Sequence, residues 1–408
     1  MKKHIPSNLE TLTQTAHRIL LLQGPIGGFF RDFSTWLSQT HNKQVFKINF
    51  NCGDETYYPN HLPNTFAYRD TLEAFDPYLT AFIKQHDIQA IVCFGDTRPY
   101  HMIAKHIAEQ YKLTFWVFEE GYFRPHLVTL EQYGVNALSR LPCQATFFLD
   151  ALPQLTQQHY QPPSTVPSGF WVNALPAMNY YFQARKDQQD YPHYVHHRAY
   201  SVHFYTKNWA CSLLKRAVHW PYEKWFNHKI RQGALGRFYI VPLQVTTDSQ
   251  VRIHSDFSSV RSFLLQTMAS FALYAPKDSK LIIKHHPMDR GFISYRKYIF
   301  AFIKKHPECK GRIFYVYDVS LPELLRKGSG MVTINSTSGL SALLHNMPVI
   351  ALGRAHYHFA GLTFQGHLRD FWRKGTPPNP KVFHAFRQYH MNVTQINGHF
   401  YSTVNLPK

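Results

Sequence analysis

The sequence predicts an α/β protein with two separate sheets of parallel strands, each covered by helices. In residues 17–122, and again in residues 236–353, short apolar runs alternate with amphipathic helical stretches. Strand, helix and strand in regular succession are typical of parallel sheets. A chain of 408 residues with 44% hydrophobic content has the material for two or three such domains.

The first block starts with a short buried run that ends in Gly24-Pro25 and continues in the same alternating way. We expect strands at 17–25, 44–50, 88–96 and 113–122, and helices at 27–42, 71–87 and 98–111. The second block follows the same rule. We expect strands at 236–245, 280–287, 312–318, 330–336 and 347–353, helices at 260–275, 320–329 and 337–346, and a helix pair in the tail from about 370.

The expected organisation is an N-terminal Rossmann-like domain (1–150), a helical connector (151–235), a C-terminal Rossmann-like domain (236–370) and a helical tail (371–408). The connector is aromatic, basic and rich in histidine. Such a segment suits a membrane-facing surface, where Trp, Tyr, Lys and Arg lie at the level of the headgroups. We favour ordinary packing helices instead, because the apolar positions are enough to explain packing.

The net charge of +19 favours an anionic partner, namely nucleic acid, an anionic membrane or a phosphorylated substrate. No nucleic-acid-binding motif is recognised, and the five cysteines form no CxxC pair, so neither a zinc site nor a disulfide framework is indicated. No signal peptide and no apolar stretch of about 18 residues is found. We therefore expect a cytoplasmic protein that is able to lie on the inner face of a membrane.

The strand at 280–287 ends in Lys284, His285, His286 and Pro287. The strand either simply surfaces here or holds an anion at its end. A second strand ends at Asn335 and is followed by a hydroxyl-rich helix start, Ser336-Thr337-Ser338-Gly339, which suits either a plain helix cap or a phosphate. Two anion-favouring strand ends in one domain suit a nucleotide phosphate.

Carboxylates occur near two other strand ends, and glycines follow a third. Asp248 lies in a polar loop after a strand, where it suits a base, a nucleophile or a helix cap. Glu119 and Glu120, with Arg124 nearby, suit either acid–base work or structural ion pairing. The glycines at 24, 27 and 28 suit either close approach of a substrate to the backbone or tight turns.

Seven motifs in register make the chain resemble the KpsS/LipB family of capsule polysaccharide proteins. They span residues 20 to about 365 and read LLLQGPIGGFF, INFNCGDETYYP, FGDTRPYH, FEEGYFRPHLVTLEQYGVN, VPLQVTTDSQVRIHS, IIKHHPMDRG and INSTSGLSALLHNMPVIALGRAHY. The resemblance implies the GT-B arrangement of glycosyltransferases, with two Rossmann-like domains that face a cleft. The connector and the tail carry less of it.

The resemblance implies a retaining β-Kdo transferase, where Kdo is 3-deoxy-D-manno-octulosonic acid. The enzyme would transfer the first β-Kdo from CMP-Kdo to a phosphatidylglycerol-type lipid whose acyl state stays open. No cofactor and no metal are expected. The implied partners are the inner-membrane surface, a two-module Kdo transferase and the capsule export machinery, and the implied location is the inner face of the bacterial inner membrane.

The family's roles carry over to the matching motifs. Asp248 would be the nucleophile and Glu120 the acid/base that deprotonates the acceptor. His286 would contact the CMP phosphate, with Lys284 adding charge. The remaining residues would be Ser336, Thr337 and Ser338 in the nucleotide pocket, Arg124 on the Kdo carboxylate, and Gln23, Gly24, Asp96 and Arg98 on the acceptor side. His285 is expected only to pack against the sheet.

Three other functions stay open. A non-catalytic adaptor of an export complex would tolerate alanine at Asp248 or His286. A nucleic-acid-binding protein would leave the strand-end clusters without a role. A sugar-nucleotide epimerase on the same fold would turn over CMP-Kdo without an acceptor lipid.

Overall fold

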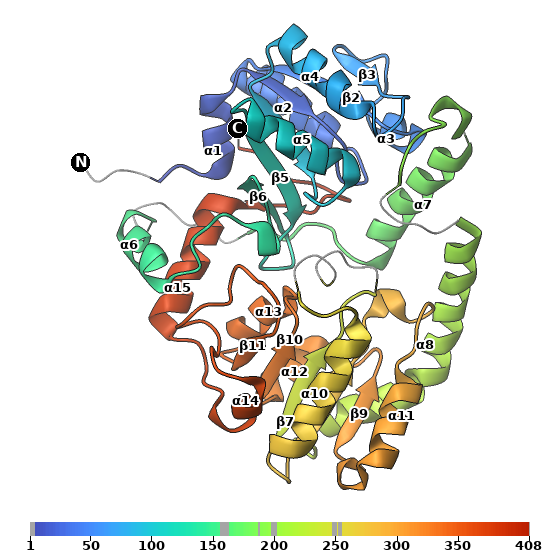
Figure 1. Cartoon of the computed structure of the whole chain (residues 1–408), viewed down its shortest axis with the longest axis vertical. Coiled ribbons are helices and arrows are strands. Elements are labelled where there is room, and N and C mark those ends of the chain that lie inside the picture. The colour runs from blue at the N-terminus through green and yellow to red at the C-terminus, as the bar shows by residue number, and fades with distance from the viewer. Residues whose placement is uncertain are drawn as a thin grey trace. The chain divides into compact units, whose positions relative to one another are not determined.

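The computed structural model describes residues 5–155, 163–186, 188–196, 202–246, 251 and 255–407. The chain divides into two compact units (Figure 1). The N-terminal unit consists of residues 1–141, 150–199 and 387–408, and the C-terminal unit consists of residues 142–149 and 200–386.

The N-terminal unit is built on a sheet of seven strands in the order β12-β6-β5-β4-β1-β2-β3. These are β1 (Arg18–Leu21), β2 (Gln44–Asn49), β3 (Thr65–Ala67), β4 (Ala90–Phe94), β5 (Thr114–Glu120), β6 (Leu127–Gln132) and β12 (Gln395–Asn397). Strands β1 to β5 are parallel, and β6 pairs antiparallel with both β5 and β12. The carboxyl ends of the parallel strands therefore lie at one edge.

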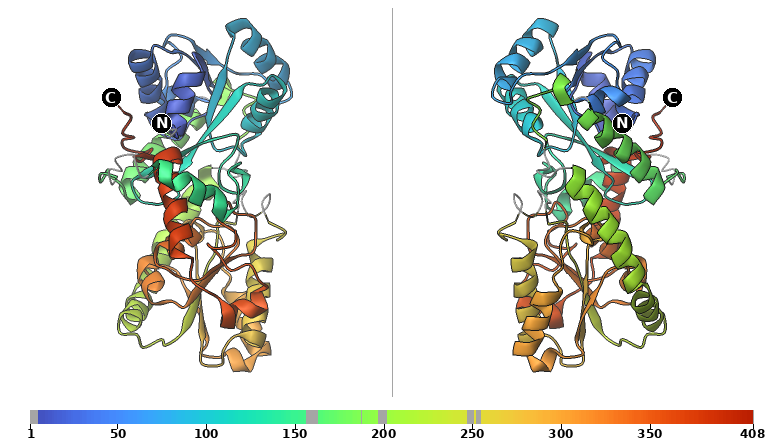
Figure 2. Two further views of the ribbon diagram at one scale, coloured as in Figure 1. Left: turned by 90° about the vertical axis from the view of Figure 1, so that its left-hand side faces the viewer. Right: turned by 90° about the vertical axis from the view of Figure 1, so that its right-hand side faces the viewer.

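Helices cover both faces of this sheet (Figure 2) because its strands are apolar on both sides. Phe46 and Ile48 of β2 pack with α4 and α5, whereas Val45 packs on the opposite face with α1 and α2. The helices of this unit are α1 (Asn8–Thr15), α2 (Phe29–His41), α3 (Cys52–Tyr57), α4 (Phe75–His86), α5 (Pro99–Gln110) and α7 (Phe170–Lys186), with short 3-10 turns η1 (Asn136–Leu138) and η2 (Gln188–Asp190) and the π-helical turn η5 (His390–Thr394).

The C-terminal unit is built on a sheet of five parallel strands in the order β11-β10-β7-β8-β9. These are β7 (Phe238–Pro242), β8 (Lys280–Lys284), β9 (Ile313–Val316), β10 (Gly330–Thr333) and β11 (Val349–Ala351). Its helices are α8 (Val202–Arg231), α10 (Val260–Tyr274), α11 (Arg296–Lys305), α12 (Leu321–Lys327), α13 (Ser338–Leu344) and α14 (Leu368–Lys374), with 3-10 turns η3 (Pro287–Asp289) and η4 (Pro307–Cys309). Two further helices, α6 (Ala145–Leu155) and α15 (Pro380–Tyr389), have residues in both units.

The predicted fold class is confirmed, and each strand and helix expected in the two blocks is present within a few residues of its expected ends. The prediction missed α1, α3, α11, β3, β6 and β12. The tail does contain the expected helix pair, α14 and α15, but it then continues into β12. A strand of three residues with no alternation of its own gives little signal, and its pairing with β6 is what makes it a strand.

The structure divides the chain differently from the four expected segments. The connector is not a separate body, because α7 belongs to the N-terminal unit and α8 to the C-terminal unit. The tail is also divided, since residues from Arg387 onward return to the N-terminal unit. The physical reason is packing between segments far apart in sequence: Tyr180 of α7 is buried beside α3, and Phe400 is buried against Phe29 of α2.

None of the helices in the described part of the chain combines the length and the apolar character that crossing a bilayer requires.

Candidate functional site

The carboxyl ends of β10, β7 and β8 form a polar edge of the C-terminal sheet, since these neighbouring strands are parallel. Gln244 follows β7 and Asn335 follows β10, and Gln244 Nε2 donates a hydrogen bond of 3.0 Å to Asn335 Oδ1. Asp289, which follows β8, accepts hydrogen bonds of 2.7 Å from both the backbone N and Oγ1 of Thr246. Side chains thus link the three strand ends into one continuous surface.

His286 lies at this edge with its protonation pattern fixed by the backbone. It precedes η3, and its Nδ1 accepts a hydrogen bond of 3.2 Å from the backbone N of Met288. A neutral imidazole whose Nδ1 accepts carries its proton on Nε2. The ring is partly exposed, so Nε2–H is a donor suited to an anionic oxygen.

The two residues before His286 serve the sheet itself. Lys284 is buried, and its Nζ donates a hydrogen bond of 3.0 Å to the carbonyl oxygen of Tyr317, while burial lowers the pKa of the ammonium. His285 packs against the rings of Tyr315 and Tyr317, as expected, and burial lowers its pKa to about 4. Both positions are therefore parts of the core at this edge, and donor binding by Lys284 stays a prediction.

The hydroxyl-rich turn after β10 does not use its threonine as a cap. Thr337 is the N-cap of α13, yet its side chain makes no capping hydrogen bond. The backbone N of Ser338 donates instead to Ser336 Oγ at 3.1 Å. The turn is held from outside by Tyr357, whose hydroxyl donates to the carbonyl oxygen of Ser336 at 2.5 Å.

Gly339 permits that contact. A Cβ at this position would lie 2.4 Å from the Tyr357 hydroxyl oxygen, which is closer than real Cβ contacts come. The glycine of this motif is thus explained by the close approach of a tyrosine ring. The predicted nucleophile, Asp248, lies outside the described residues.

The corresponding edge of the N-terminal sheet holds a buried polar cluster around Asp54. Gln23 follows β1, and its Nε2 donates to both carboxylate oxygens of Asp54, at 3.3 and 3.2 Å. Tyr180 of α7 donates its hydroxyl to Asp54 Oδ1 at 2.9 Å. Gln23 Nε2 also lies 2.9 Å from the hydroxyl oxygen of Tyr194. We name these four residues the Asp54 cluster.

The Asp54 cluster depends on the turn that follows β2. Asn51 caps α3, since its Oδ1 accepts from the backbone N of Asp54 at 3.0 Å. Lys47 is buried nearby, and burial lowers its pKa to about 8, although the charge of Asp54 opposes this shift. Lys47, Asp54 and Tyr180 line a small cavity of about 20 Å³.

Asp96 and Arg98 follow β4 at the same edge. Asp96 is buried, and its Oδ2 accepts a hydrogen bond of 3.0 Å from the backbone N of Val135; burial raises the pKa of this carboxyl. Arg98 donates from NH1 to the carbonyl oxygen of Gly24 at 3.4 Å, and its guanidinium lies 5.2 Å from the centroid of the Phe94 ring. The ends of β1 and β4 are thus in direct contact.

The two glutamates at the end of β5 differ from each other. Burial raises the pKa of Glu119 to about 7, and its Oε1 accepts a hydrogen bond of 2.9 Å from the backbone N of Glu120. Burial also raises the pKa of Glu131, on the paired strand β6, to about 7. Arg124 is exposed, and its Nε donates to the carbonyl oxygen of Gly121 at 3.2 Å. A carboxyl with a pKa near 7 is suited to proton transfer.

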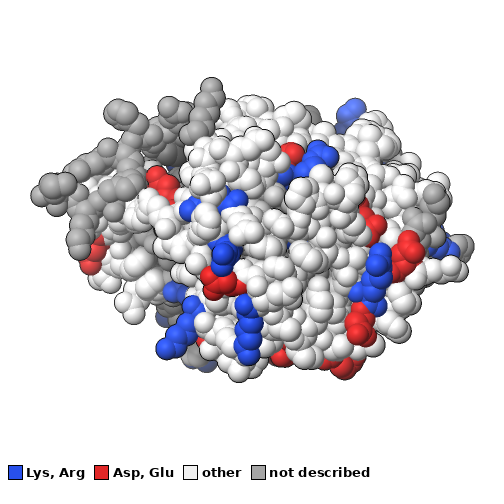
Figure 3. All heavy atoms as spheres, turned by 90° about the horizontal axis from the view of Figure 1, so that it is seen from above, with Lys and Arg blue, Asp and Glu red and all other residues white. Residues whose placement is uncertain are grey.

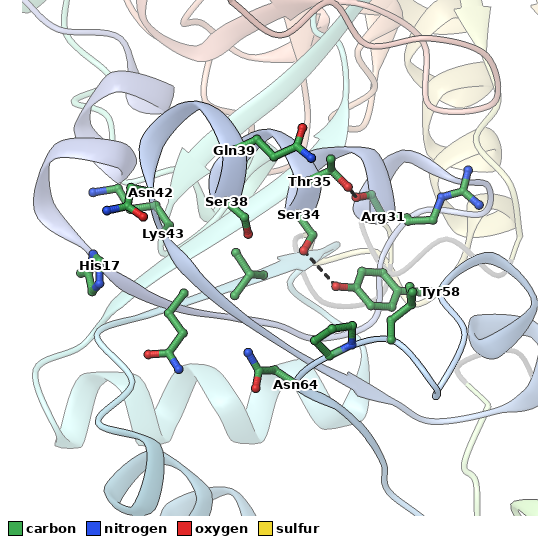
Figure 4. Close-up of a pocket in the computed structure, with 14 residues that line it drawn as sticks. His17, Arg31, Ser34, Thr35, Ser38, Gln39, Asn42, Lys43, Tyr58 and Asn64 are labelled. Carbon is green, nitrogen blue, oxygen red and sulfur yellow. Dashed lines mark hydrogen bonds between the residues drawn. The ribbon is translucent and has the colours of Figure 1, made fainter.

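A larger pocket of about 550 Å³ opens beside α2 in the N-terminal unit (Figure 4). It is lined by polar side chains that include Arg31, Ser34, Ser38 and Lys43. The hydroxyl of Tyr58 donates to Ser34 Oγ at 2.9 Å. None of the predicted site residues lines this pocket, so its size alone does not make it the site.

The structure therefore brings Gln23, Gly24 and Arg98 together, and it places His286 and the serines at one sheet edge. Within the described part of the chain, no hydrogen bond or ion pair joins Glu120 to Arg124. Sequence reasoning named Gln23 but missed its partners Asp54, Tyr180 and Tyr194 in the Asp54 cluster. It named Glu119 with Glu120 as suited to acid–base work but assigned the acid/base role to Glu120. The signal for Asp54 was the NCGD turn directly after a buried strand, but its partners Tyr180 and Tyr194 come from a segment with no matching pattern.

Among the described residues, no group of three or more His, Cys, Asp or Glu side chains is placed to hold a metal ion.

The sequence has close relatives among capsule proteins. Residues 89–401 match the family model described as capsule polysaccharide biosynthesis protein. The chain is 54% identical over 403 residues to the capsule polysaccharide modification protein LipB of Neisseria meningitidis serogroup B, covering 99% of this chain and 96% of that protein. It is 38% identical over 396 residues to the capsule polysaccharide export protein KpsS of Escherichia coli, covering 97% of this chain and 99% of that protein.

Solved structures with a distant likeness include the β-Kdo 2,7 transferase of Thermosulfurimonas dismutans KpsC. It has 12% identity, coverage of 93% of this chain and 92% of that one, and a TM-score of 0.41. A complex of Staphylococcus aureus MnaA with UDP has 11% identity, coverage of 95% and 92%, and a TM-score of 0.32. Likenesses at this level do not transfer an activity.

Proposed function

The chain belongs to the family of capsule polysaccharide biosynthesis proteins, and we propose that it acts in capsule assembly as a glycosyltransferase. The proposed reaction transfers the first β-Kdo residue from CMP-Kdo to a phosphatidylglycerol-type lipid with retention. Donor and acceptor rest on the family resemblance of the seven sequence motifs. The names of the relatives, a capsule polysaccharide modification protein and a capsule polysaccharide export protein, agree with a role in the same process.

The observation that carries the proposal is the composition of the C-terminal sheet edge. His286 offers an Nε2–H donor at the end of β8, and Ser338 offers a hydroxyl group at the end of β10, where it accepts a hydrogen bond of 3.1 Å from Ser336 Oγ. One strand, β7, lies between them, so the two groups are separated by about two strand spacings, roughly 10 Å. That span fits a nucleotide with its phosphate better than a lone anion, and ligands of open α/β sheets bind at this edge.

The proposed mechanism is a double displacement. The carboxylate of Asp248 attacks the anomeric carbon of Kdo, the bond to the CMP phosphate breaks, and CMP leaves. The acceptor hydroxyl, which gives its proton to Glu120, then attacks the same carbon and displaces Asp248. Two inversions give net retention. The pKa of about 7 at Glu119 supports proton transfer at this strand end.

The other residues hold the substrates. His286 and the serines at 336 and 338 would bind the nucleotide phosphate, with Lys284 and Thr337 behind them. Arg124 would pair with the Kdo carboxylate. On the acceptor side, Gln23, Gly24, Asp96 and Arg98 would line the sheet edge. The scheme uses neither a metal nor a cofactor. Because the acceptor is a lipid, the protein would work on the inner face of the inner membrane, together with a two-module Kdo transferase and the export machinery.

The test is a transfer assay followed by mass spectrometry. Purified protein is mixed with CMP-Kdo, generated in situ, and a fluorescent phosphatidylglycerol analogue. The expected product is the acceptor with one added Kdo. Asp248→Ala is expected to abolish transfer, and His286→Ala to reduce it strongly. His345→Ala serves as the matched control, because His345 is an exposed histidine at the C-terminal end of α13 and no role is assigned to it.

The outcomes separate the competing functions. Unmodified acceptor with folded protein and intact donor would overturn the transferase in favour of a non-catalytic adaptor. Donor turnover without acceptor would point to an epimerase, provided that free Kdo from hydrolysis is measured and excluded. Transfer that survives Asp248→Ala would leave the enzyme in place and remove Asp248 as the nucleophile.

A further inference from the structure

Helix α8 has one face that belongs to the core of the C-terminal unit. Ser212, Glu223, Phe226 and Ile230 are buried, and they recur at helical spacing along one side. The ring of His219, on the same side, stacks on Tyr317 with 4.5 Å between ring centroids. Helix α8 is therefore packed against the C-terminal unit along its length.

This inner face is joined to the edge that would bind the nucleotide. The carboxylate of Glu223 accepts hydrogen bonds from the backbone N of Tyr317 at 2.9 Å and of Asp318 at 3.0 Å. The carbonyl oxygen of Tyr317 accepts from Lys284 Nζ at 3.0 Å. Asn227 Oδ1 accepts from the backbone N of Ser320 at 3.2 Å, one turn further along. A surface that binds α8 would therefore also fix the position of the residues that follow β9, next to β8.

The opposite face of α8 exposes large apolar side chains. Val218 is 75% exposed and Leu214 is 69% exposed, and both lie on the side away from Glu223. The exposed apolar set on this helix is Leu213, Leu214, Val218, Trp220, Tyr222 and Trp225. Single exposed apolar residues are ordinary, but a contiguous set on one helix indicates a binding surface. We name this set the α8 outer face.

The charged residues of α8 itself are nearly all basic, although Arg231 Nε lies 3.6 Å from Glu323 Oε1 of α12. Glu223 is the only acidic residue in Val202–Arg231, and it points inward, whereas the helix carries Lys207, Lys215, Arg216, Lys224, Lys229 and Arg231. Two of the lysines lie over exposed rings: Lys224 Nζ is 4.9 Å from the centroid of Trp220, and Lys229 Nζ is 4.1 Å from that of Trp225. By contrast, the face of the molecule in Figure 3 has basic and acidic residues interspersed.

We propose that the α8 outer face is a membrane-docking surface that lies in the interface of an anionic phospholipid leaflet. Apolar and aromatic side chains flanked by lysine and arginine fit the boundary between headgroups and acyl chains. If a second copy of the chain docked here through the same face, positive charge would lie against positive charge. If a nucleic acid bound here, the side chains of Leu213, Leu214 and Val218 would stay exposed to water. An anionic lipid surface satisfies both the apolar set and the charge.

The N-terminal unit has a helix of the same kind. Helix α7 turns Tyr180 inward to the Asp54 cluster, while Trp171, Leu175, Met178 and Phe182 are each more than 60% exposed. Their spacing of four, three and four residues places them on one side of the helix. We include these four residues as the docking surface of the N-terminal unit. The proposal rests on the proposed function, because it names the surface that meets the lipid acceptor.

The test compares binding to vesicles with and without anionic lipid. Full-length protein is floated with vesicles of phosphatidylcholine containing about one third phosphatidylglycerol, or of phosphatidylcholine alone. The wild type is expected to bind the anionic vesicles, and Leu214→Glu/Val218→Glu to lose at least about tenfold in binding with an unchanged Tm, since both positions are exposed. Leu273→Glu on α10, at a position also 69% exposed, is the matched control and should bind like the wild type.

A second pair of variants tests the charge. Lys224→Gln/Lys229→Gln is expected to weaken binding to anionic vesicles and to leave binding to neutral vesicles unchanged. Equal binding by wild type and the Leu214/Val218 variant would overturn the proposal. So would dissociation of an oligomer by that variant in sedimentation velocity, which would make the face an interface between copies.

Transfer to a short-chain, water-soluble acceptor separates this proposal from the proposed function. The Leu214/Val218 variant should keep transfer to the soluble acceptor and lose transfer to vesicle-bound acceptor. Vesicle binding that depends on the α8 outer face, without any transfer to either acceptor, would support the docking surface and overturn the transferase.

Discussion

The two sheet edges share one architecture and differ in chemistry. At the N-terminal edge, Asp54 and Asp96 are buried and Glu119 is half-buried: Asp54 is surrounded by donors, and desolvation raises the pKa values of Asp96 and Glu119. At the C-terminal edge, donors are presented, with an Nε2–H on His286 and the hydroxyl of Ser338, which itself accepts a hydrogen bond of 3.1 Å from Ser336 Oγ. Fold alone therefore does not assign a role to an edge, and the side chains that follow each strand do.

The same comparison explains the buried cations. The carboxylates of Glu223 and Asp318 lie near Lys284, but its ammonium donates a hydrogen bond to the backbone carbonyl oxygen of Tyr317. Lys47 is likewise used on the carbonyl oxygen of Ile48, at 2.6 Å. In both units a buried lysine in the sheet thus donates to a backbone carbonyl, and the groups left to meet a ligand are the less buried ones.

The largest expected effect follows from breaking the Asp54 cluster. Asp54→Ala removes the acceptor of Gln23 Nε2, the Tyr180 hydroxyl and the backbone N of Phe50, which donates to Oδ2 at 3.1 Å. Each buried donor left unsatisfied costs about 1–3 kcal/mol, so we expect the free energy of unfolding to fall by about 3–5 kcal/mol. Urea denaturation followed by circular dichroism measures this loss.

Tyr180→Phe is the graded control for that variant. It removes one hydroxyl and keeps the ring, so a fall of about 1 kcal/mol is expected. If Asp54→Ala were no more destabilising than Tyr180→Phe, the Asp54 cluster would not be what holds α7 on the N-terminal unit. The contact between Tyr180 and Asp54 would then not explain why α7 belongs to that unit.

The second effect concerns the donor edge. His286→Ala is expected to lower kcat/KM for CMP-Kdo by about 10- to 100-fold, because a hydrogen bond to an anionic group contributes about 1.5–3 kcal/mol. The Tm should stay within a degree or two, since the ring is partly exposed. Steady-state kinetics on the purified variant measures the change.

His286→Gln tests the proton assignment, because a glutamine amide supplies an N–H donor at similar reach and should restore part of the rate. A rate for His286→Gln no better than that for His286→Ala would argue against Nε2–H as the donor. His345→Ala should leave kcat/KM unchanged.

Much of this comparison was accessible from the sequence. Apolar runs that end in polar residues predicted both sheets and placed His286, Ser336 and Arg98 at strand ends, because strand periodicity is local information. The sequence did not reveal that Lys284 is used by the core, nor that Tyr180 reaches Asp54. Those facts depend on contacts between residues more than 30 and more than 120 positions apart, which no local pattern encodes. The short strand β12 was missed for the same reason.

A third and smaller effect concerns the turn after β10. Gly339→Ala would push a methyl group into the Tyr357 hydroxyl, so we expect a loss of about 1–3 kcal/mol in stability together with weaker donor binding. The double variant Gly339→Ala/Tyr357→Phe removes the clashing oxygen and should recover part of the stability. It should not recover donor binding fully, because the hydroxyl that holds the carbonyl of Ser336 is gone. Equal stability of the single and double variants would contradict this account.

The smallest effect is a pH dependence at the N-terminal edge. Burial raises the pKa of Glu119 from the usual 4.5 to about 7, so between these values the folded state binds more protons than the unfolded state. Stability contributed by this group is therefore present below about pH 4.5 and is lost as the pH rises to about 7. Glutamine cannot ionise, so the stability of the Glu119→Gln variant relative to the wild type should rise across that window and level off above it. The expected rise is about 1–2 kcal/mol after allowance for partial solvent access.

Thermal melts between pH 5 and pH 8 measure this difference in stability. Glu131→Gln is the companion variant, because burial raises the pKa of Glu131 to about 7 as well. A difference that stays flat with pH would show that Glu119 is ionised throughout, and it would remove the carboxyl that distinguishes this edge as the one suited to proton transfer.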